Sequence, residues 1–233
     1  MLKGAGIMII LLSAAIAPGL ALFSYFYLRN QMATEPRKTL LQTFLYGAFL
    51  TFPILFLQYV LTEEGFFDMF TYKMFFFPVS LKSFFKWFIL LIAIYNHVEF
   101  DDPYDGILYG ASVSLGFATI ENVLYLLSFG LDTAFMRALL PVSSHALFGV
   151  VMGYYYGRAK FLKLAKTKEM IAMALCAPVV LHILYNTILS FKGHWVYLMI
   201  PFMLFLWWFG LRKVKLAHYH LVQHLHMHKN IKA

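Results

Sequence analysis

Charged residues are scarce in this chain. Only 13% of its 233 residues are Asp, Glu, Lys or Arg, about half the share of an ordinary soluble domain. In contrast, 61% of the residues are hydrophobic and the mean hydropathy is +0.71. This composition argues against a soluble globular protein and favours an integral membrane protein. A single cysteine, Cys176, excludes an intrachain disulfide and leaves the redox compartment open.

Long polar linkers are also missing, so two separate soluble domains are not expected. The chain alternates between short polar loops and stretches close to the ~20 apolar residues that a membrane-crossing helix needs. Seven such stretches are found, at 5–28, 39–61, 74–96, 106–129, 138–157, 169–189 and 194–211. They predict an all-α, polytopic integral membrane protein with about seven transmembrane helices. Residues 1–211 are expected to form one membrane domain, and 212–233 a basic, histidine-rich cytoplasmic tail.

The placement of Lys and Arg predicts the orientation of the chain. Basic residues concentrate in loop 158–168, in loop 29–38 and at the start of the tail. The positive-inside rule places these segments in the cytoplasm, the N-terminus outside and the C-terminus inside a cell membrane. The short N-terminus lacks a small-residue cleavage site, which predicts a retained first span. The net charge of +8 lies mainly in these loops and the tail, so the lipid bilayer, and not nucleic acid, is the expected partner.

Three ionisable residues interrupt the apolar spans. Glu121 lies in GFATIENVLYLL, His145 in LPVSSHALFGVVMGYYYG and His182 in APVVLHILYNTIL. Such groups are costly in hydrocarbon, and within a span they usually face a protein interior or a water-filled cavity. With the predicted orientation, all three lie at a similar depth in the outer half of the membrane. We therefore expect one shared polar site.

The chemistry of that site stays open at this point. Glu121 could be a general base, a metal ligand or the structural partner of a buried cation. His145 and His182 could bond neighbouring helices, bind zinc together with Glu121, or act without metal as acid–base groups or oxyanion donors. Asn186 follows His182 by one helical turn and shares its face, so it could orient the imidazole or donate to an oxyanion. A divalent metal such as zinc and a metal-free glutamate mechanism are both compatible with these residues.

Other polar residues have simpler interpretations. Lys82 and Lys86 are four apart near the outer end of the third span, where lysines commonly snorkel to the headgroups. The acidic residues Glu99, Asp101, Asp102 and Asp105 could bind a cation, but a solvated loop is the favoured interpretation. The tail histidines are expected to be solvated, although a metal-binding or pH-sensing tail is an alternative; they are His218, His220, His224, His226 and His228.

Several stretches resemble the PrsW family of intramembrane proteases, which is distantly similar to the CAAX prenyl endopeptidases. The resemblance covers nearly the whole chain, and its most specific part is residues 98–127. The family's Phe-x-x-x-Glu motif matches Phe117 and Glu121. Its two histidine motifs match His145 and His182, the latter with Asn186 four residues later. The resemblance implies that these residues belong to a catalytic site.

One family motif is altered. The family's Glu-Glu-x-x-Lys corresponds here to Lys82, Ser83 and, four residues after the first position, Lys86. The resemblance assigns activation of the attacking water to that glutamate pair, a role that Lys and Ser do not fill unaided. Three explanations stay open: a natural inactive relative, engineered inactivation, or a local sequence error from two compensating frameshifts around 78–83.

The resemblance implies a function and a partner. It indicates hydrolysis of a peptide bond in a single-span membrane protein, namely the site-1, extracytoplasmic-side cut in a membrane-anchored anti-sigma factor that starts a stress response. Two alternatives are a catalytically inactive relative that binds such substrates and a small proton-coupled transporter, since buried Glu and His also occur in carriers.

Overall fold

The computed structural model describes most of the chain, and the described residues form helices joined by short connections, without a strand. Parts of the two basic loops lie outside the described residues. The described ranges are 2–29, 37–64, 77–161, 166–191 and 193–232.

Seven helical segments in the described part of the chain are long and apolar enough to cross a membrane, which confirms the predicted fold class. The α-helices are α1 (Leu2–Leu28), α2 (Arg37–Glu63), α3 (Phe77–Ile89), α4 (Asp105–Phe129), α5 (Ala134–Arg137), α6 (Ser143–Phe161), α7 (Thr167–Leu189) and α8 (Trp195–Lys232). Two π-helical stretches, η2 (Leu90–Ile94) and η4 (Ala138–Val142), extend α3 and join α5 to α6. A 3₁₀ turn, η3 (Leu131–Thr133), precedes α5, so the fifth segment is built from four pieces.

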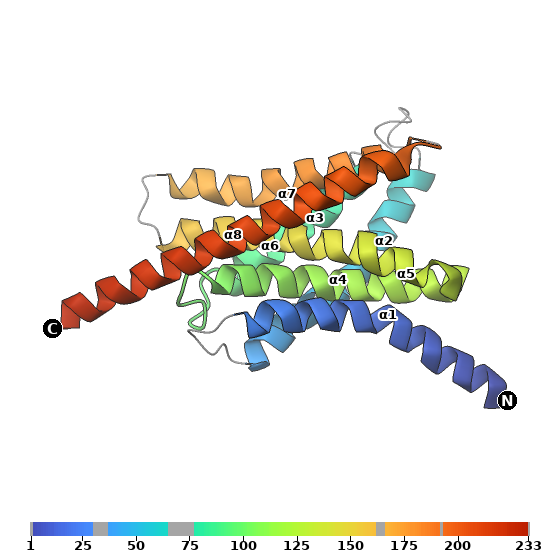
Figure 1. Cartoon of the computed structure of the whole chain (residues 1–233), viewed down its shortest axis with the longest axis horizontal. Helices are drawn as coiled ribbons and strands as arrows, with labels where there is room; N and C mark the ends of the chain where they lie inside the picture. The colour runs from blue at the N-terminus through green and yellow to red at the C-terminus, as the bar shows by residue number, and fades with distance from the viewer. Residues whose placement is uncertain (1, 30–36, 65–76, 162–165, 192, 233) are drawn as a thin grey trace.

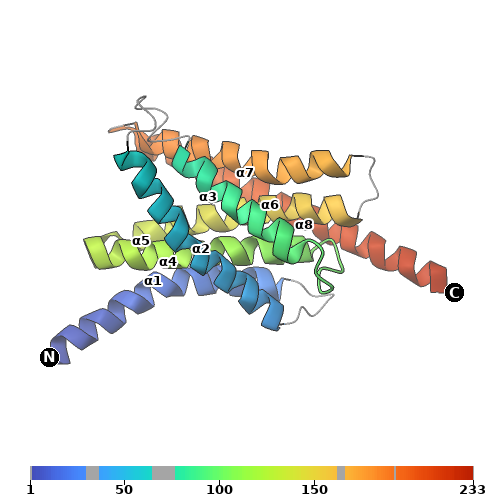
Figure 2. The same cartoon turned by 180° about the vertical axis from the view of Figure 1, so that it is seen from behind.

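The long helices lie side by side, with the N- and C-termini at opposite ends of the bundle along its long axis (Figures 1 and 2). Helix α4 forms the centre and packs against α1, α2 and α6. In its most apolar window 78% of the residues are buried, against 17% in α1 and 33% in α2. A polar residue on α4 therefore faces protein on most sides and lipid on few.

Glycines bring α4 and α6 into backbone contact. Gly106 and Gly110 on α4 face Gly153 and Gly149 on α6, and a Cβ added at any of the four would overlap the backbone of the facing helix. Small residues spaced four apart are a common way for membrane helices to approach closely. This seam places Glu121, three turns further along α4, close to the first turn of α6.

Gly153→Ala is expected to destabilise the bundle. The new methyl group would meet the carbonyl oxygen of Gly106, which cannot rotate away, so the two helices must separate. We expect a loss of about 1–3 kcal/mol in the free energy of unfolding, measured by denaturant titration in detergent micelles. Gly6→Ala on α1 is the matched control, because its Cβ would enter open space. Equal stability of the two variants would contradict this account of the seam.

The acidic loop before α4 is a helix cap. The Asp102 carboxylate accepts hydrogen bonds from the backbone N–H groups of Tyr104 (2.6 Å) and Asp105 (3.1 Å). The Asp105 carboxylate accepts in return from the N–H groups of Asp101 (2.9 Å) and Asp102 (2.7 Å). This reciprocal pattern has the i, i+3 form of a capping box, although it lies just before the N-cap residue of α4, Tyr104. Asp102 and Asp105 are buried, so the expectation of a solvated loop is wrong for these two residues, while Asp101 is exposed.

Helix α8 continues past residue 211 without a break. Val214, Ala217 and Leu221 are buried against the bundle. The His218 ring lies 4.5 Å from the Tyr104 ring and the His224 ring 5.4 Å from the Phe161 ring, measured between centroids. These two histidines are half-buried packing residues, so the expectation of solvated side chains is wrong for them. The cytoplasmic assignment of 212–233 stays a prediction.

Candidate active site

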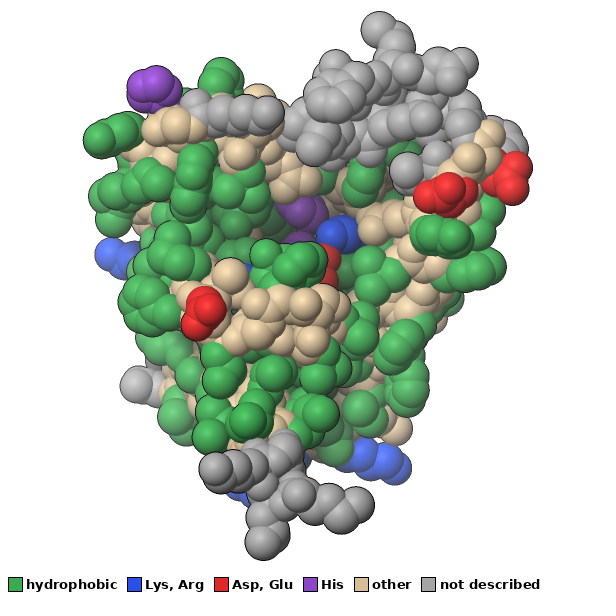
Figure 3. Space-filling view, turned by 90° about the vertical axis from the view of Figure 1, so that its right-hand side faces the viewer, with side chains coloured by type: hydrophobic (Ala, Val, Ile, Leu, Met, Phe, Trp, Pro, Cys, Tyr) green, Lys and Arg blue, Asp and Glu red, His purple; other side chains and the backbone are tan. Residues whose placement is uncertain are grey.

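A small polar cavity opens between α3, α4, α6 and α7. Its volume is about 160 Å³. Two larger hollows, of about 380 and 420 Å³, lie between α1 and α2 and between α3 and α7, and apolar side chains line most of both. The end of the bundle that carries the N-terminus is hollowed, and histidine, cationic and acidic side chains are visible inside the hollow (Figure 3). The residues that line the small cavity are Lys82, Glu121, Arg137, Pro141, Ser144, His145, His182, Tyr185, Asn186 and Leu189.

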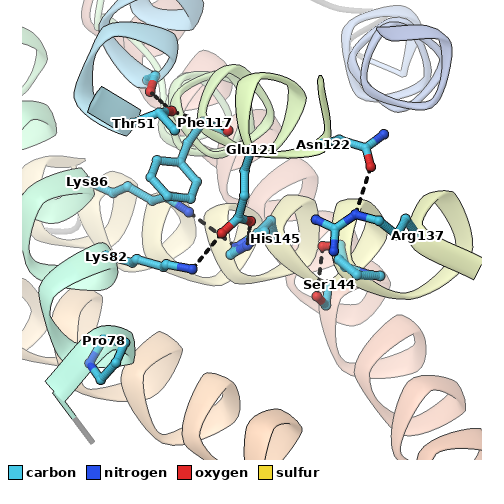
Figure 4. A network of polar contacts seen from close by, with 12 residues as sticks. Thr51, Pro78, Lys82, Lys86, Phe117, Glu121, Asn122, Arg137, Ser144 and His145 are labelled. Carbon is cyan, nitrogen blue, oxygen red and sulfur yellow. Dashed lines mark hydrogen bonds and ion pairs between the residues drawn. The ribbon is translucent and has the colours of Figure 1, made fainter. Parts of the chain in front are cut away.

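Glu121 is the centre of the polar contacts. One carboxylate oxygen, Oε1, lies 2.5 Å from Lys82 Nζ, and the other, Oε2, lies 3.1 Å from His145 Nε2. Lys82 and Glu121 each expose 17% of their side chains. The three side chains point toward one another from α3, α4 and α6 (Figure 4). Both oxygens of the carboxylate are therefore engaged by groups of the chain itself.

Lys86 extends these contacts on the other side of His145. Its Nζ lies 3.2 Å from His145 Nδ1 and 4.2 Å from the centre of the Phe117 ring. An ammonium group only donates hydrogen bonds, so Nδ1 accepts and the proton of the imidazole is on Nε2, facing Glu121. The hydrogen bonds form a chain from Lys86 through His145 to Glu121, where Lys82 donates from the opposite side.

His182 approaches this chain from α7. Its ring centre lies 5.1 Å from that of His145, with the two planes nearly perpendicular, and it stacks on the Phe148 ring at 5.0 Å. Asn186 lines the same cavity one turn later. The structure thus brings together the three ionisable residues that the sequence singled out, and places Phe117, Lys86 and Asn186 beside them. Their catalytic roles stay predictions.

The two lysines of α3 do not snorkel to the headgroups, so that interpretation is wrong. Lys86 is only 3% exposed, and Ser83 is buried beside it. Phe84 and Phe88 are exposed on the other side of the helix. In a membrane the polar face of a helix turns toward the protein interior, because charged side chains are costly in contact with lipid hydrocarbon and apolar ones are not. The partly buried carboxylate of Glu121 on α4 supplies the partner that holds Lys82 inside.

Sequence reasoning missed three polar residues that line the cavity, Arg137, Ser144 and Tyr185. The predicted spans 106–129 and 138–157 leave Arg137 in the loop between them. Its Nε donates to Asn122 Oδ1 at 2.9 Å, and its guanidinium lies 3.9 Å from the centre of the Tyr125 ring. Helix α5 and the π-helical stretch η4 carry it to the cavity. Pro141, two residues before Ser143 and inside η4, was the available signal, because proline interrupts regular α-helix and π-helical stretches often occur at functional sites.

A polytopic helical protein with a Glu–His pair, a second histidine and lysines in one buried cavity has the features of a membrane-embedded hydrolase. The family model described as "PrsW family intramembrane metalloprotease" matches residues 35–209. The chain belongs to the PrsW family and is by that membership a membrane-embedded endopeptidase.

Three relatives, each named Protease PrsW, illustrate the similarity. The chain is 51% identical to the protein of Bacillus subtilis (strain 168) over 90% of its own length and 96% of the relative's. It is 52% identical to the protein of Geobacillus kaustophilus (strain HTA426), over 89% of its own length and 92% of the relative's. It is 31% identical to the protein of Clostridioides difficile (strain 630), over 86% of its own length and 88% of the relative's. No solved structure matches the chain significantly.

The family description includes a metal, and the residues in this cavity do not fit one as they stand. A catalytic zinc site needs three free ligand atoms from His or carboxylate side chains. Here both oxygens of Glu121 and both nitrogens of His145 are engaged, and two ammonium groups lie among them. Their positive charge opposes the entry of a divalent cation.

Proposed function

We propose that this protein makes the site-1, extracytoplasmic-side cut in a membrane-anchored anti-sigma factor. The observation that carries the proposal is the convergence of Glu121, His145 and His182 on one cavity. That cavity opens at the end of the bundle that carries the N-terminus (Figures 1 and 3). With the N-terminus outside, as the basic loops predict, a peptide bond close to the outer membrane surface would reach it. We further propose that the membrane is the cell membrane.

The cavity residues suit the charge changes of peptide hydrolysis. Attack of water on the peptide carbonyl places negative charge on its oxygen, and preorganised donors stabilise that charge. Lys82, Arg137 and His145 are donors that line the cavity, and Lys86 reinforces the orientation of His145. Glu121 is the carboxylate among the lining residues and the candidate to accept the proton of water. Each of its oxygens has one partner, Lys82 or His145, and keeps a second acceptor site for water entering from the cavity.

The ion pair between Lys82 and Glu121 favours a second candidate function. A protein whose base is held by an ammonium group could bind a single-span substrate in the membrane without cleaving it. The two functions differ in one measurable property, since a binder retains intact substrate whereas a protease releases fragments.

The test is cleavage of a purified single-span anti-sigma factor by the purified protein in liposomes. For the protease we expect fragments that disappear in Glu121→Ala, His145→Ala and His182→Ala, with losses of about 10²-fold or more. Glu169→Ala is the matched control, because that carboxylate is 61% exposed on α7 and lines no part of the cavity. Intact substrate that co-purifies with the unchanged chain would overturn the protease and support the binder.

A further inference from the structure

We propose that Lys82 is a built-in cation that replaces a metal ion in this chain. The Glu121, His145 and His182 cluster then excludes a divalent metal as the sequence stands, and acquires a zinc site once the Lys82 ammonium group is removed. The proposal deepens the proposed function, since it concerns the same cavity, but metal binding is measured without any cleavage.

The position of the ammonium group is the first argument. Lys82 Nζ lies 2.5 Å from Glu121 Oε1. A zinc ion would need to lie about 2.0–2.2 Å from a carboxylate oxygen, in much the same place. The lysine and the metal therefore compete for one site. Lys82 is part of α3, whose inner face is buried against the bundle, so its ammonium group is held near Glu121, whereas a metal ion must bind from solution.

The use of the imidazole is the second argument. His145 accepts from Lys86 at Nδ1 and donates from Nε2 to Glu121. Metal binding through Nε2 would require that proton to leave and the hydrogen bond to Glu121 to break. Lys86 is 3% exposed and lies against the Phe117 ring, so it has little room to withdraw.

The spacing of the possible ligands is the third argument. Among the described residues, the group of His, Cys, Asp or Glu ligand atoms that lie within 4.8 Å of one another is Asp101, Asp102 and Asp105. Two of those carboxylates, of Asp102 and Asp105, accept the hydrogen bonds at the start of α4 described above. Glu121, His145 and His182 are neighbours, yet they do not form such a compact group. As the sequence stands, their ligand atoms are therefore not gathered around one point.

The experiment compares zinc binding by variants at position 82 in detergent. The chain, Lys82→Met and Lys82→Glu are stripped with chelator, dialysed against micromolar zinc and assayed for bound metal by elemental analysis. Each of these proteins is also assayed with the additional change Glu121→Gln. The zinc bound with Glu121 present, minus the zinc bound with Gln at that position, measures the zinc held in the cavity. This subtraction removes any zinc held by the tail histidines or by the α4 cap. Lys168→Met, an exposed lysine at the other end of the bundle, is the matched control.

We expect a Glu121-dependent difference near zero for the unchanged chain and for Lys168→Met, and about one zinc ion per chain for the two Lys82 variants. The thermal midpoint of the Lys82 variants should rise with zinc, which also shows that they are folded. Glu121-dependent zinc in the unchanged chain, or folded Lys82 variants that bind no more than it does, would overturn the proposal. Zinc binding by Lys82→Met without cleavage of any substrate would count against the protease alone.

Discussion

Changing Lys82 and Ser83 together to glutamate is expected to raise the rate of substrate cleavage at least ~10²-fold over the unchanged chain, a typical contribution of a positioned general base. The ion pair to Lys82 now engages the carboxylate of Glu121. The double change removes that ammonium group and places two carboxylates on the same inward face of α3. This pair is the one to which the family resemblance assigns activation of water.

The measurement is the initial rate of fragment formation from a single-span substrate, with the unchanged chain and the double variant at equal concentration. Lys82→Glu and Ser83→Glu alone separate loss of the ammonium group from gain of the second carboxylate. Lys168→Glu controls for added negative charge far from the cavity. Equal rates for the unchanged chain and the double variant would show that position 82 does not limit catalysis.

Glu121→Gln is expected to lower the free energy of unfolding by roughly 3 kcal/mol, the low end of the effect of breaking a buried ion pair. Glutamine keeps the shape of the side chain but leaves the ammonium group of Lys82 without a counter-charge, at a position where only 17% of its side chain is exposed. Adding Lys82→Met to Glu121→Gln should recover most of the loss, because the unpaired charge is then gone.

Denaturant titration in micelles, carried out on the two single variants and the double variant, measures this coupling. Glu169→Gln provides the comparison, since its pair with Lys166 spans 3.4 Å between side chains that are 61% and 67% exposed. Exposed pairs contribute at most about 1 kcal/mol. A Glu121→Gln effect no larger than that of Glu169→Gln would mean that water enters the cavity freely enough to screen Lys82.

The spans and the centre of the site were predictable from the sequence for one physical reason. Apolar runs of membrane-crossing length leave little choice of secondary structure, and a charged or polar side chain within them must find a polar partner. This reasoning located Glu121, His145 and His182 before any contact was known. The family resemblance added Phe117 and Lys86, which lie against His145 and each other.

The wrong predictions of side-chain exposure also share a cause. The lysines of α3, the aspartates before α4 and the histidines of α8 were each judged by their own position in the sequence. Burial depends on the neighbouring element, and here that element is distant in sequence: α4 for Lys82, the Tyr104 ring for His218. Asp102 and Asp105 differ, because their capping pattern is local and could have been recognised.

By itself, the sequence determined that this protein is an all-α membrane protein with a polar site and an altered glutamate motif. Hydropathy and motif identity are properties of residue types and their order, so they need no coordinates. Only the tertiary structure decided that Lys82 pairs with Glu121, that Arg137 reaches the cavity, and that the ligand atoms of His145 are engaged. These facts depend on how α3, α5 and α6 pack around α4. Packing sets which charges meet, and therefore whether the cavity holds an ammonium group or a metal ion.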